Sequence, residues 1–397
     1  MKKIGIFGGT FNPVHKDHIA MARAAIEKLS LDKLIVMPTF IPPHKEVSLA
    51  PAKDRLAMLS LAFGTGCGVA DNGLTGDCVT CGANTANDGK IEISGFEIAC
   101  GGKSYTYLTV EHFAGEGELY FIVGGDMLAD FKTWRYPERI LASAKLAAFG
   151  REGFSEDVEK EREYFKKNFG KDFSYLTFEG AGDSSTEIRV YNSLSLDISG
   201  FTDLRVAEYI KKNGLYAGGA AEKYVREHLP LKRLIHTANV AVCALKKARE
   251  TGLSEEKILT AAILHDCAKY ADMKDFPDFT LPEGVPEPVV HSFLGAYVAE
   301  KVVGIKDEEV LDAIRYHTSG KAAMTTLGKL IFVADMIEKG RDYEGVEKLR
   351  RKYDEGLDEC FKACLKEEVI HLLNKKSYVY SETLNAYEYY ITQNKKD

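Results

Sequence analysis

The sequence predicts an α/β domain built on a parallel sheet, followed by an all-α helical bundle. Over the first 150 residues, apolar runs alternate with helical patterns, which is typical of βαβ units. After a Gly-Gly-Ala-Ala stretch at 218–221, amphipathic helical patterns separated by short breaks take over. The length of 397 residues also suits two or three domains of about 100 to 200 residues each. We therefore expect a first domain at 1–216, a linker at 217–222 and a second domain at 223–397.

The first domain alternates strands with helices. The predicted strands are Lys3–Phe7, Lys33–Met37, Leu119–Val123 and Lys145–Phe149, and the predicted helices are Ile19–Leu29, Ala52–Ala62 and Pro137–Leu141. Residues 64–90 interrupt the rhythm and are rich in Gly, Asn, Asp and Thr, which indicates an inserted loop. Within it, Cys78 and Cys81 have the spacing of a zinc knuckle, with Cys67 and Cys100 nearby. Zinc sites of this type usually need two such pairs, so a flexible insertion is favoured over a structural zinc.

The second domain reads as helices throughout. The predicted helices are Glu222–His228, Leu231–Thr251, Ser254–Tyr270, His291–Val303, Asp307–His317, Thr326–Lys339 and Tyr343–Asn374. Ser254 is expected to cap its helix, because a serine oxygen can accept a hydrogen bond from an unpaired N–H of the first turn. Glu255 and Glu256 follow at the positive end of the helix dipole, where carboxylates are favoured.

Composition and charge narrow the function classes. Lys and Arg number 52 against 59 Asp and Glu, a formal balance of −7, which argues against a non-specific nucleic-acid binder. No apolar run approaches the ~20 residues of a membrane span, and the start of the chain does not resemble a signal peptide. Eight cysteines in a chain this long indicate free thiols. We expect a cytoplasmic protein that binds neither nucleic acid nor membrane, and an oligomer remains an open alternative.

The first candidate site follows the first predicted strand. Gly8 and Gly9 end that strand and let backbone N–H groups approach a phosphate, while the following helix adds positive potential. His15 and His18 stand three residues apart at the start of this helix, so both imidazoles can face one phosphate chain. A single histidine is more often structural, but the complete string from Gly8 to His18 points to a phosphate site.

The string Gly8-Gly9-Thr10-Phe11-Asn12-Pro13-Val14-His15 with His18 resembles the (H/T)xxH nucleotidyltransferase superfamily, specifically the nicotinate-nucleotide adenylyltransferases. The resemblance covers about residues 1–216 and implies a Rossmann-like nucleotidyltransferase fold. Further similar strings, in order, are Pro42-Pro43-His44-Lys45, Ser104-Tyr105-Thr106, Gly124-Gly125-Asp126-Met127 with Trp134, Arg151, and Ser185-Thr186-Glu187-Ile188-Arg189. Asp17, Leu108 and Asp183 depart from the pattern of the family.

The resemblance implies that the 5′-phosphate of nicotinate mononucleotide attacks the α-phosphorus of ATP and releases pyrophosphate. The catalytic residues implied are His15, His18, Lys45 and Arg189, acting with Mg²⁺ through positioning and charge stabilisation. The ATP-binding residues implied are Gly8, Gly9, Thr10, Phe11, Asp126, Ser185 and Thr186, and the acceptor-binding residues are Thr106, Trp134 and Arg151. Phosphopantetheine and nicotinamide mononucleotide are the alternative acceptors.

The second candidate site combines histidines and aspartates of the helical domain. His265 and Asp266 end an apolar helix together, and a carboxylate beside an imidazole in an apolar setting favours a cation. The complete set, in order, is His236, His265, Asp266, His291, His317 and Asp335. This order resembles the HD-domain metal phosphohydrolases, and among them the bacterial symmetrical diadenosine-tetraphosphate hydrolases, over about residues 222–375.

The resemblance implies one metal held by His236, His265, Asp266 and Asp335, and a second held by His291 and His317, with Asp266 as the bridge. Mixed imidazole and carboxylate ligands suit one or two transition-metal ions such as iron or manganese. Such ions would activate a water for attack on phosphorus. Asp266 and Lys269 are the implied catalytic residues, and Arg341 is an implied partner of substrate phosphate.

Together, the two resemblances predict a bifunctional enzyme with ATP, nicotinate mononucleotide and a dinucleoside polyphosphate as ligands. The alternative from another class is an HD domain that senses nucleotides with little catalysis. Retention of all six candidate ligands argues for catalysis.

Overall fold

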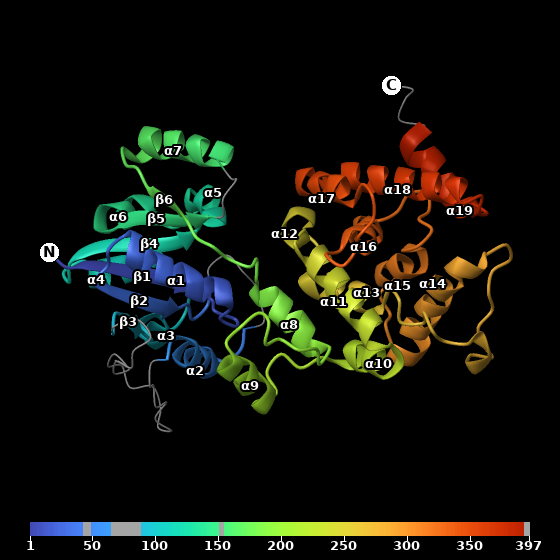
Figure 1. The fold of residues 1–397 in the computed structure, drawn as a ribbon, viewed down its shortest axis with the longest axis horizontal. Coiled ribbons are helices and arrows are strands. Elements are labelled where there is room, and N and C mark those ends of the chain that lie inside the picture. Colours follow the sequence, from blue (N-terminus) through green and yellow to red (C-terminus); the bar gives the residue numbers. More distant parts are fainter. Residues whose placement is uncertain (43–48, 65–88, 151–154, 393–397) are drawn as a thin grey trace. The chain divides into compact units, whose positions relative to one another are not determined.

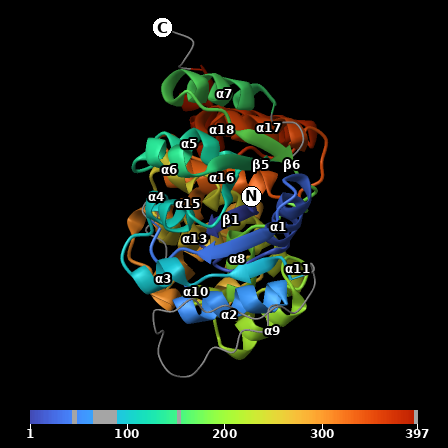
Figure 2. The same ribbon diagram turned by 90° about the vertical axis from the view of Figure 1, so that its left-hand side faces the viewer.

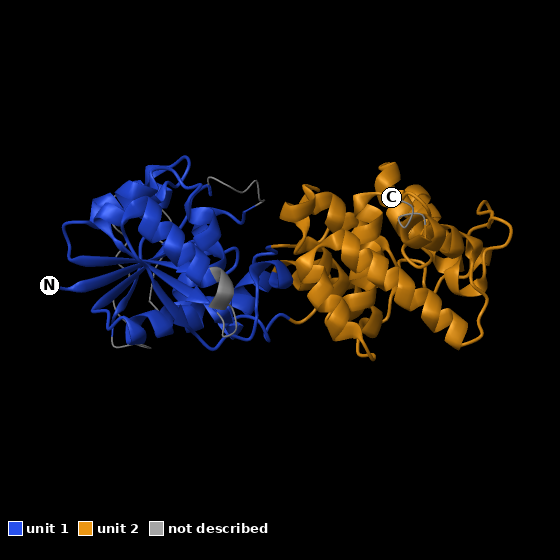
Figure 3. Ribbon diagram, turned by 90° about the horizontal axis from the view of Figure 1, so that it is seen from above, with its two compact units in different colours: residues 1–188, 198–215 blue, residues 189–197, 216–397 orange. Residues whose placement is uncertain are grey.

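The computed structural model describes residues 1–42, 49–64, 89–150 and 155–392. The chain divides into two compact units, one formed by residues 1–188 and 198–215 and the other by residues 189–197 and 216–397 (Figure 3). Helix α8 (Ser185–Ser193) therefore begins in the first unit, and its last residues belong to the second. Among the described helices, none is long and apolar enough to cross a membrane.

The first unit is built on a six-stranded parallel sheet with the order β3-β2-β1-β4-β5-β6 (Figures 1 and 2). The strands are β1 (Lys3–Gly9), β2 (Lys33–Pro38), β3 (Ile91–Ile93), β4 (Glu118–Gly124), β5 (Lys145–Gly150) and β6 (Ser174–Thr177). The four strands predicted from apolar runs are the four central ones, since both faces of a parallel sheet are buried. The short outer strands β3 and β6 lack such runs and were not predicted.

Helices connect these strands, as parallel pairing requires. Besides α8, the helices of this unit are α1 (Lys16–Lys28), α2 (Ala52–Phe63), α3 (Phe96–Cys100), α4 (Thr106–Phe113), α5 (Leu128–Phe131), α6 (Pro137–Ser143), α7 (Ser155–Phe169) and α9 (Leu204–Lys212), the last of which follows the final strand, with a 3₁₀ turn η1 (Gly125–Met127). Because parallel strands end on the same edge of a sheet, the carboxyl ends of β1, β2, β4 and β5 lie along one edge.

The second unit is helical throughout its described residues. Its helices are α10 (Ala220–His228), α11 (Leu231–Leu245), α12 (Ala248–Thr251), α13 (Glu255–Leu264), α14 (Glu287–Val298), α15 (Glu308–Tyr316), α16 (Thr326–Ile337), α17 (Val346–Glu355), α18 (Leu357–Asn374) and α19 (Ser381–Tyr387). Short 3₁₀ or π segments are η2 (Met273–Asp275), η3 (Ala299–Val303) and η4 (Glu388–Thr392). The fold class predicted from the sequence is confirmed.

Several helix boundaries differ from the predictions. The single helix predicted at Tyr343–Asn374 is wrong, because Gly356 adopts an extended backbone (φ 163°, ψ 150°) and separates α17 from α18. The helix predicted to run to Tyr270 ends at Leu264, and tight turns follow it. The Ser254 cap is confirmed, since its Oγ accepts a hydrogen bond from Lys257 N at 3.2 Å.

Candidate active sites

A cavity of about 910 Å³ opens at the edge of the sheet where the parallel strands end. The loops after β1, β2 and β4 contribute to its lining, and so do the end of β5 and the starts of α1 and α4. The predicted site residues that line it are Gly8, Gly9, Thr10, His15, His18, Thr106, Asp126 and Trp134. The fold therefore brings these eight predicted residues to one cavity, whereas Phe11, Ser185 and Thr186 are not part of its lining.

His18 is the best-defined polar group of this cavity. Its Nδ1 accepts a hydrogen bond from the backbone N–H of His15 at 3.3 Å, and the two rings lie with centroids 3.6 Å apart and planes tilted by 33°. Burial, reinforced by the neighbouring His15, holds the pKa of His18 well below its usual value, so the ring is neutral near pH 7. A neutral ring whose Nδ1 accepts must carry its hydrogen on Nε2, which makes that atom a hydrogen-bond donor.

The glycine loop rests on a buried phenylalanine. Phe11 is fully buried and packs edge-on against Phe7 and His18, with ring centroids at 5.3 and 4.9 Å. A Cβ on Gly9 would approach the Phe11 ring to 3.1 Å, so a side chain there would require the ring to shift by a few tenths of an ångström. Phe11 thus supports the loop from below with its side chain.

Asp17, one of the departures from the family pattern, has a structural partner. Its two carboxylate oxygens accept hydrogen bonds from the backbone N–H groups of Ala181 at 2.9 Å and Gly182 at 3.2 Å. Just beyond this loop, Ser185 starts α8, and its hydroxyl donates to Pro13 O at 2.7 Å. Asp17 therefore fixes the segment that leads into the Ser185-Thr186 motif.

The other end of the cavity is aromatic. The Trp134 indole lies 5.2 Å from Phe131 and 6.0 Å from Phe121 between ring centroids, and the Arg135 guanidinium lies 4.8 Å above the Tyr105 ring. Leu108, the second departure, is about half exposed on α4.

Glu97 is a buried acid in the lining of this cavity. It accepts a hydrogen bond from Thr109 Oγ1 at 2.6 Å. Burial raises the pKa of Glu97 above its usual value. Asp183, the third departure, is also buried beside the cavity.

Some predicted residues of the first site are placed elsewhere or not described. Lys45, Arg151 and almost all of the 64–90 loop lie outside the described residues. Arg189, four residues after Ser185 on α8, belongs to the second unit, where burial lowers the pKa of its guanidinium against the opposing effects of Glu255 and Tyr216.

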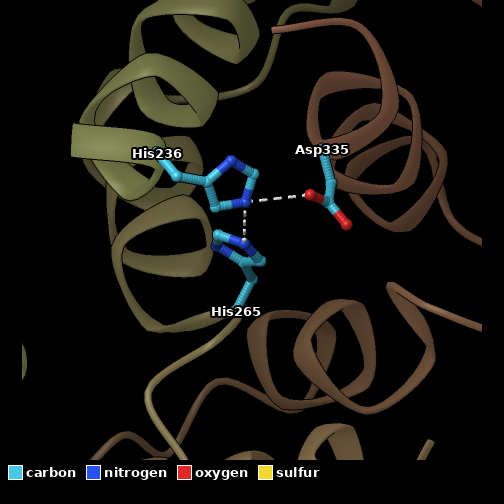
Figure 4. A group of neighbouring side chains, drawn as sticks. All are labelled: His236, His265 and Asp335. Carbon is cyan, nitrogen blue, oxygen red and sulfur yellow. Dashed lines mark hydrogen bonds and ion pairs between the residues drawn. The ribbon is translucent and has the colours of Figure 1, made fainter. Parts of the chain in front are cut away.

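The second unit gathers all six predicted metal ligands from α11, α13, α14, α15 and α16 and the residues that directly follow them. Figure 4 shows His236, His265 and Asp335 facing one another, with His236 Nε2 3.0 Å from Asp335 Oδ1 and 3.4 Å from His265 Nε2. Two groups have the proximity that a metal ion requires: His236 with His265 and Asp335, and His265 with Asp266 and His317. His291 adjoins them, with Nε2 3.1 Å from Asp266 Oδ1.

The rings of His265 and His317 are held in one orientation. Nδ1 of His265 lies 2.7 Å from Ala262 O, and Nδ1 of His317 lies 2.8 Å from Ile314 O. A backbone carbonyl can only accept, so each Nδ1 carries the hydrogen, and the neutral ring is left with a lone pair on Nε2. Both Nε2 atoms stand 3.5 Å from carboxylate oxygens of Asp266. Lone pairs beside a buried carboxylate suit a cation between them, so these residues fit a metal ion, although Thr318 Oγ1 also lies 3.0 Å from His317 Nε2.

The electrostatics of the cluster agree with this chemistry. Burial lowers the pKa of His265 to about 4, against the opposing effect of Asp266. Burial alone would raise the pKa of Asp266, but His265, His291 and His317 outweigh it and hold that pKa well below its usual value. Asp266 as a carboxylate and His265 as a neutral imidazole are the forms that bind metals.

These geometries fit what comparison with known proteins finds. A cytidylyltransferase-like family model matches residues 6–190, and an HD domain model matches residues 233–340. A probable nicotinate-nucleotide adenylyltransferase of Clostridium tetani is 36% identical over 221 residues, which is 54% of this chain and 100% of the relative. A symmetrical bis(5′-nucleosyl)-tetraphosphatase of Bacillus subtilis is 33% identical over 175 residues, 42% of this chain and 94% of the relative. The chain belongs to both families.

A third relative carries both parts in one chain. It is a probable nicotinate-nucleotide adenylyltransferase/Ap4A hydrolase of Mycoplasma genitalium, 27% identical over 353 residues, which cover 86% of this chain and 89% of the relative. The first unit is accordingly a nicotinate-nucleotide adenylyltransferase domain, and the second is an HD domain of the symmetrical tetraphosphatase family.

The HD domain also contains charged residues that the sequence analysis did not single out. Arg233, one helical turn before His236, donates to Asp266 Oδ2 at 2.7 Å. Glu338 lies 3.1 Å from His236 Nδ1 and is 3% exposed. Both lie three residues from a predicted ligand on or beside the same helix, and this spacing was the available signal.

The two predicted cations of the HD domain lie beside the ligands. Lys269 Nζ is 3.1 Å from His291 Nε2 and 3.9 Å from Asp266 Oδ1. Arg341 forms an ion pair with Asp335 and donates from Nε to its backbone carbonyl at 2.7 Å. Both therefore belong to the shell around the candidate metal site.

Proposed function

We propose that the first unit transfers the adenylyl group of ATP to nicotinate mononucleotide. The oxygen of the acceptor's 5′-phosphate forms a bond to the α-phosphorus, the bond to the β-phosphate bridge breaks, and pyrophosphate leaves. No covalent protein intermediate is needed, so the task of the protein is positioning and charge stabilisation. The observation that carries this proposal is His18, which lines the same cavity as Trp134 and whose fixed tautomer leaves Nε2–H as a hydrogen-bond donor.

Other residues have supporting roles in the proposal. The N–H groups of Gly8, Gly9 and Thr10 and the hydroxyls of Ser185 and Thr186 bind the triphosphate, whose charge Mg²⁺ neutralises. His15, Lys45 and Arg189 complete the set of positive or donor groups, while Phe11 supports the loop and Asp126 binds ATP. Thr106, Trp134 and Arg151 bind the acceptor.

The second unit hydrolyses dinucleoside polyphosphates at a metal centre of iron or manganese. His236, His265, Asp266, His291, His317 and Asp335 hold the metal, which supplies Lewis acidity and an activated water. Lys269, Arg341 and Arg233 bind the substrate phosphates in this proposal, because their positive charges lie beside the ligands. The observation that carries this proposal is the convergence of the His265 and His317 lone pairs on Asp266.

The two activities are tested separately on the full chain. One reaction contains ATP, Mg²⁺ and nicotinate mononucleotide, and the other contains diadenosine tetraphosphate without acceptor. The expected products are deamido-NAD with pyrophosphate in the first, and ADP alone in the second. ATP with AMP in the second reaction would contradict symmetrical cleavage, and turnover of nicotinamide mononucleotide or phosphopantetheine in place of nicotinate mononucleotide would contradict the acceptor.

Two variants assign the activities to the sites. His18→Ala should abolish adenylyl transfer and leave hydrolysis near the wild-type rate, because its ring belongs to the first unit alone. Asp266→Ala removes the carboxylate that faces His265, His291 and His317, so metal content and hydrolysis should both disappear while adenylyl transfer continues. His317→Ala should lower metal content less than Asp266→Ala does. Loss of both activities in either folded variant would contradict this assignment.

A further inference from the structure

A segment from the end of α8 is built into the HD domain, although it precedes the linker predicted from the sequence. Residues 189–197 belong to the second unit. Arg226 Nη1 donates to Ser193 O at 2.6 Å, and Asn192 Nδ2 donates to Tyr216 O at 3.2 Å. These bonds hold the segment in place, and Tyr191 lies at its centre with 7% exposure.

Tyr191 begins a chain of buried hydrogen bonds that ends at a candidate metal ligand. Its hydroxyl donates to Asn239 Oδ1 at 2.6 Å. The side-chain amide of Asn239 is in turn hydrogen-bonded to the Glu338 carboxylate, and Glu338 Oε1 lies 3.1 Å from His236 Nδ1. Asn239 and Glu338 are only 5% and 3% exposed, so water does not easily replace a missing partner.

The donor and the acceptor of each of these hydrogen bonds follow from the chemistry of the side chains. The Asn239 oxygen accepts from Tyr191, so the amide nitrogen is the atom that faces Glu338 and donates to it. Glu338 then accepts from both Asn239 and His236, and a hydrogen on His236 Nδ1 directs Nε2 toward Asp335. Without the Tyr191 hydroxyl, the Asn239 amide is free to turn its oxygen toward the carboxylate, which would repel it.

We infer that Tyr191 is a positioning residue of the HD metal site and acts through Asn239 and Glu338 on His236. The inference rests on the proposed metal-binding function of that site. Neither family model reaches Tyr191, because they match residues 6–190 and 233–340. The HD domain of this chain is therefore completed by a residue of the helix that carries the Ser185-Thr186 motif.

The test measures metal affinity of the full-length protein by competition with a chelator, using Mn²⁺ as the probe. Partners of a metal-bound histidine typically change affinity by about 10- to 100-fold when removed, so Glu338→Ala should fall in that range. Tyr191→Phe acts two bonds further away and should weaken Mn²⁺ binding by roughly 3- to 10-fold, below that reference range. Adenylyl transfer should stay at the wild-type rate in Tyr191→Phe.

Tyr353→Phe is the matched control. Tyr353 is a buried tyrosine of the same unit, and its hydroxyl donates to Cys243 O at 2.9 Å. This carbonyl takes no part in the hydrogen bonds that connect Tyr191 to His236. This variant loses a buried hydrogen bond of the same kind and should keep wild-type Mn²⁺ affinity. Equal Mn²⁺ affinity of Tyr191→Phe and wild type, or an equal loss in Tyr353→Phe, would overturn the inference.

A double-variant cycle distinguishes an effect through Glu338 from a general folding defect. If Tyr191 acts through Glu338, the combined Tyr191→Phe/Glu338→Ala variant should bind Mn²⁺ no more weakly than Glu338→Ala alone. Additive losses would show that Tyr191 acts by another route and would overturn the inference. Failure of the proposed function is distinguishable, because a wild-type protein that binds Mn²⁺ but cleaves no dinucleoside polyphosphate leaves these affinity results intact.

Discussion

Arg55 offers the sharpest test of how the nucleotide cavity is built. Its side chain is fully buried on α2, 1% exposed, and donates to four backbone carbonyls: Thr10 O at 2.9 Å, Thr39 O at 2.6 Å, Ala50 O at 3.1 Å and Phe40 O at 3.3 Å. Thr10 and Thr39 lie in the loops after β1 and β2 and line the cavity. One guanidinium thus fastens the phosphate loop to its neighbour.

The change is Arg55→Met, which keeps an unbranched side chain and removes every donor. Three of the four bonds are 3.1 Å or shorter. Each buried carbonyl left without a donor costs about 1 kcal/mol or more, so the expected loss is at least about 3 kcal/mol. With an m-value of about 2 kcal/mol per M urea, the unfolding midpoint should fall by about 1.5 M. The KM for ATP should rise because the glycine loop is released.

The assay uses the single tryptophan of the chain, Trp134, which lies in the first unit and reports its unfolding separately from the HD domain. Hydrolase activity of the second unit serves as the internal control and should be unchanged. Arg55→Lys keeps the charge with a single nitrogen, so its midpoint should lie between wild type and Arg55→Met. An unchanged Trp134 midpoint in Arg55→Met would refute the reasoning.

Three further predictions follow from the sites. Glu97→Gln should flatten the pH dependence of the unfolding transition followed by Trp134 fluorescence. Because the pKa of Glu97 is raised in the folded state, the stability that protonated Glu97 contributes is complete below the usual pKa of 4.5 and is lost as pH rises through the folded pKa. The thermal midpoint of the variant should therefore rise relative to that of the wild type as pH increases. Asp17→Asn replaces one of the two carboxylate oxygens that accept from Ala181 and Gly182 by an NH₂ donor. The KM for ATP should rise several-fold while the KM for the acceptor changes little, measured by pyrophosphate release. An ATP KM equal to that of the wild type would contradict this role of Asp17. Lys269→Met should raise the KM for diadenosine tetraphosphate while metal content stays at the wild-type level, and metal loss would instead assign Lys269 a role in holding the ligands.

Sequence alone determined the features that depend on short spacing. Strand β1 ends in glycines, His15 and His18 share one helix start, and Ser254 caps α13, because neighbours along the chain fix these arrangements. The order of histidines and aspartates in the second half likewise predicted six candidate ligands, and the structure places them close together.

Tertiary structure decided what depends on partners far apart in sequence. The tautomer of His236 involves Glu338, 102 residues away, and Asp17 finds its donors 164 and 165 residues away. No periodicity encodes such pairs, because each side chain meets its partner only after helices and strands have packed. The assignment of residues 189–197 to the HD domain has the same origin, since Tyr191 and Asn239, 48 residues apart, are joined by burial and not by any local pattern.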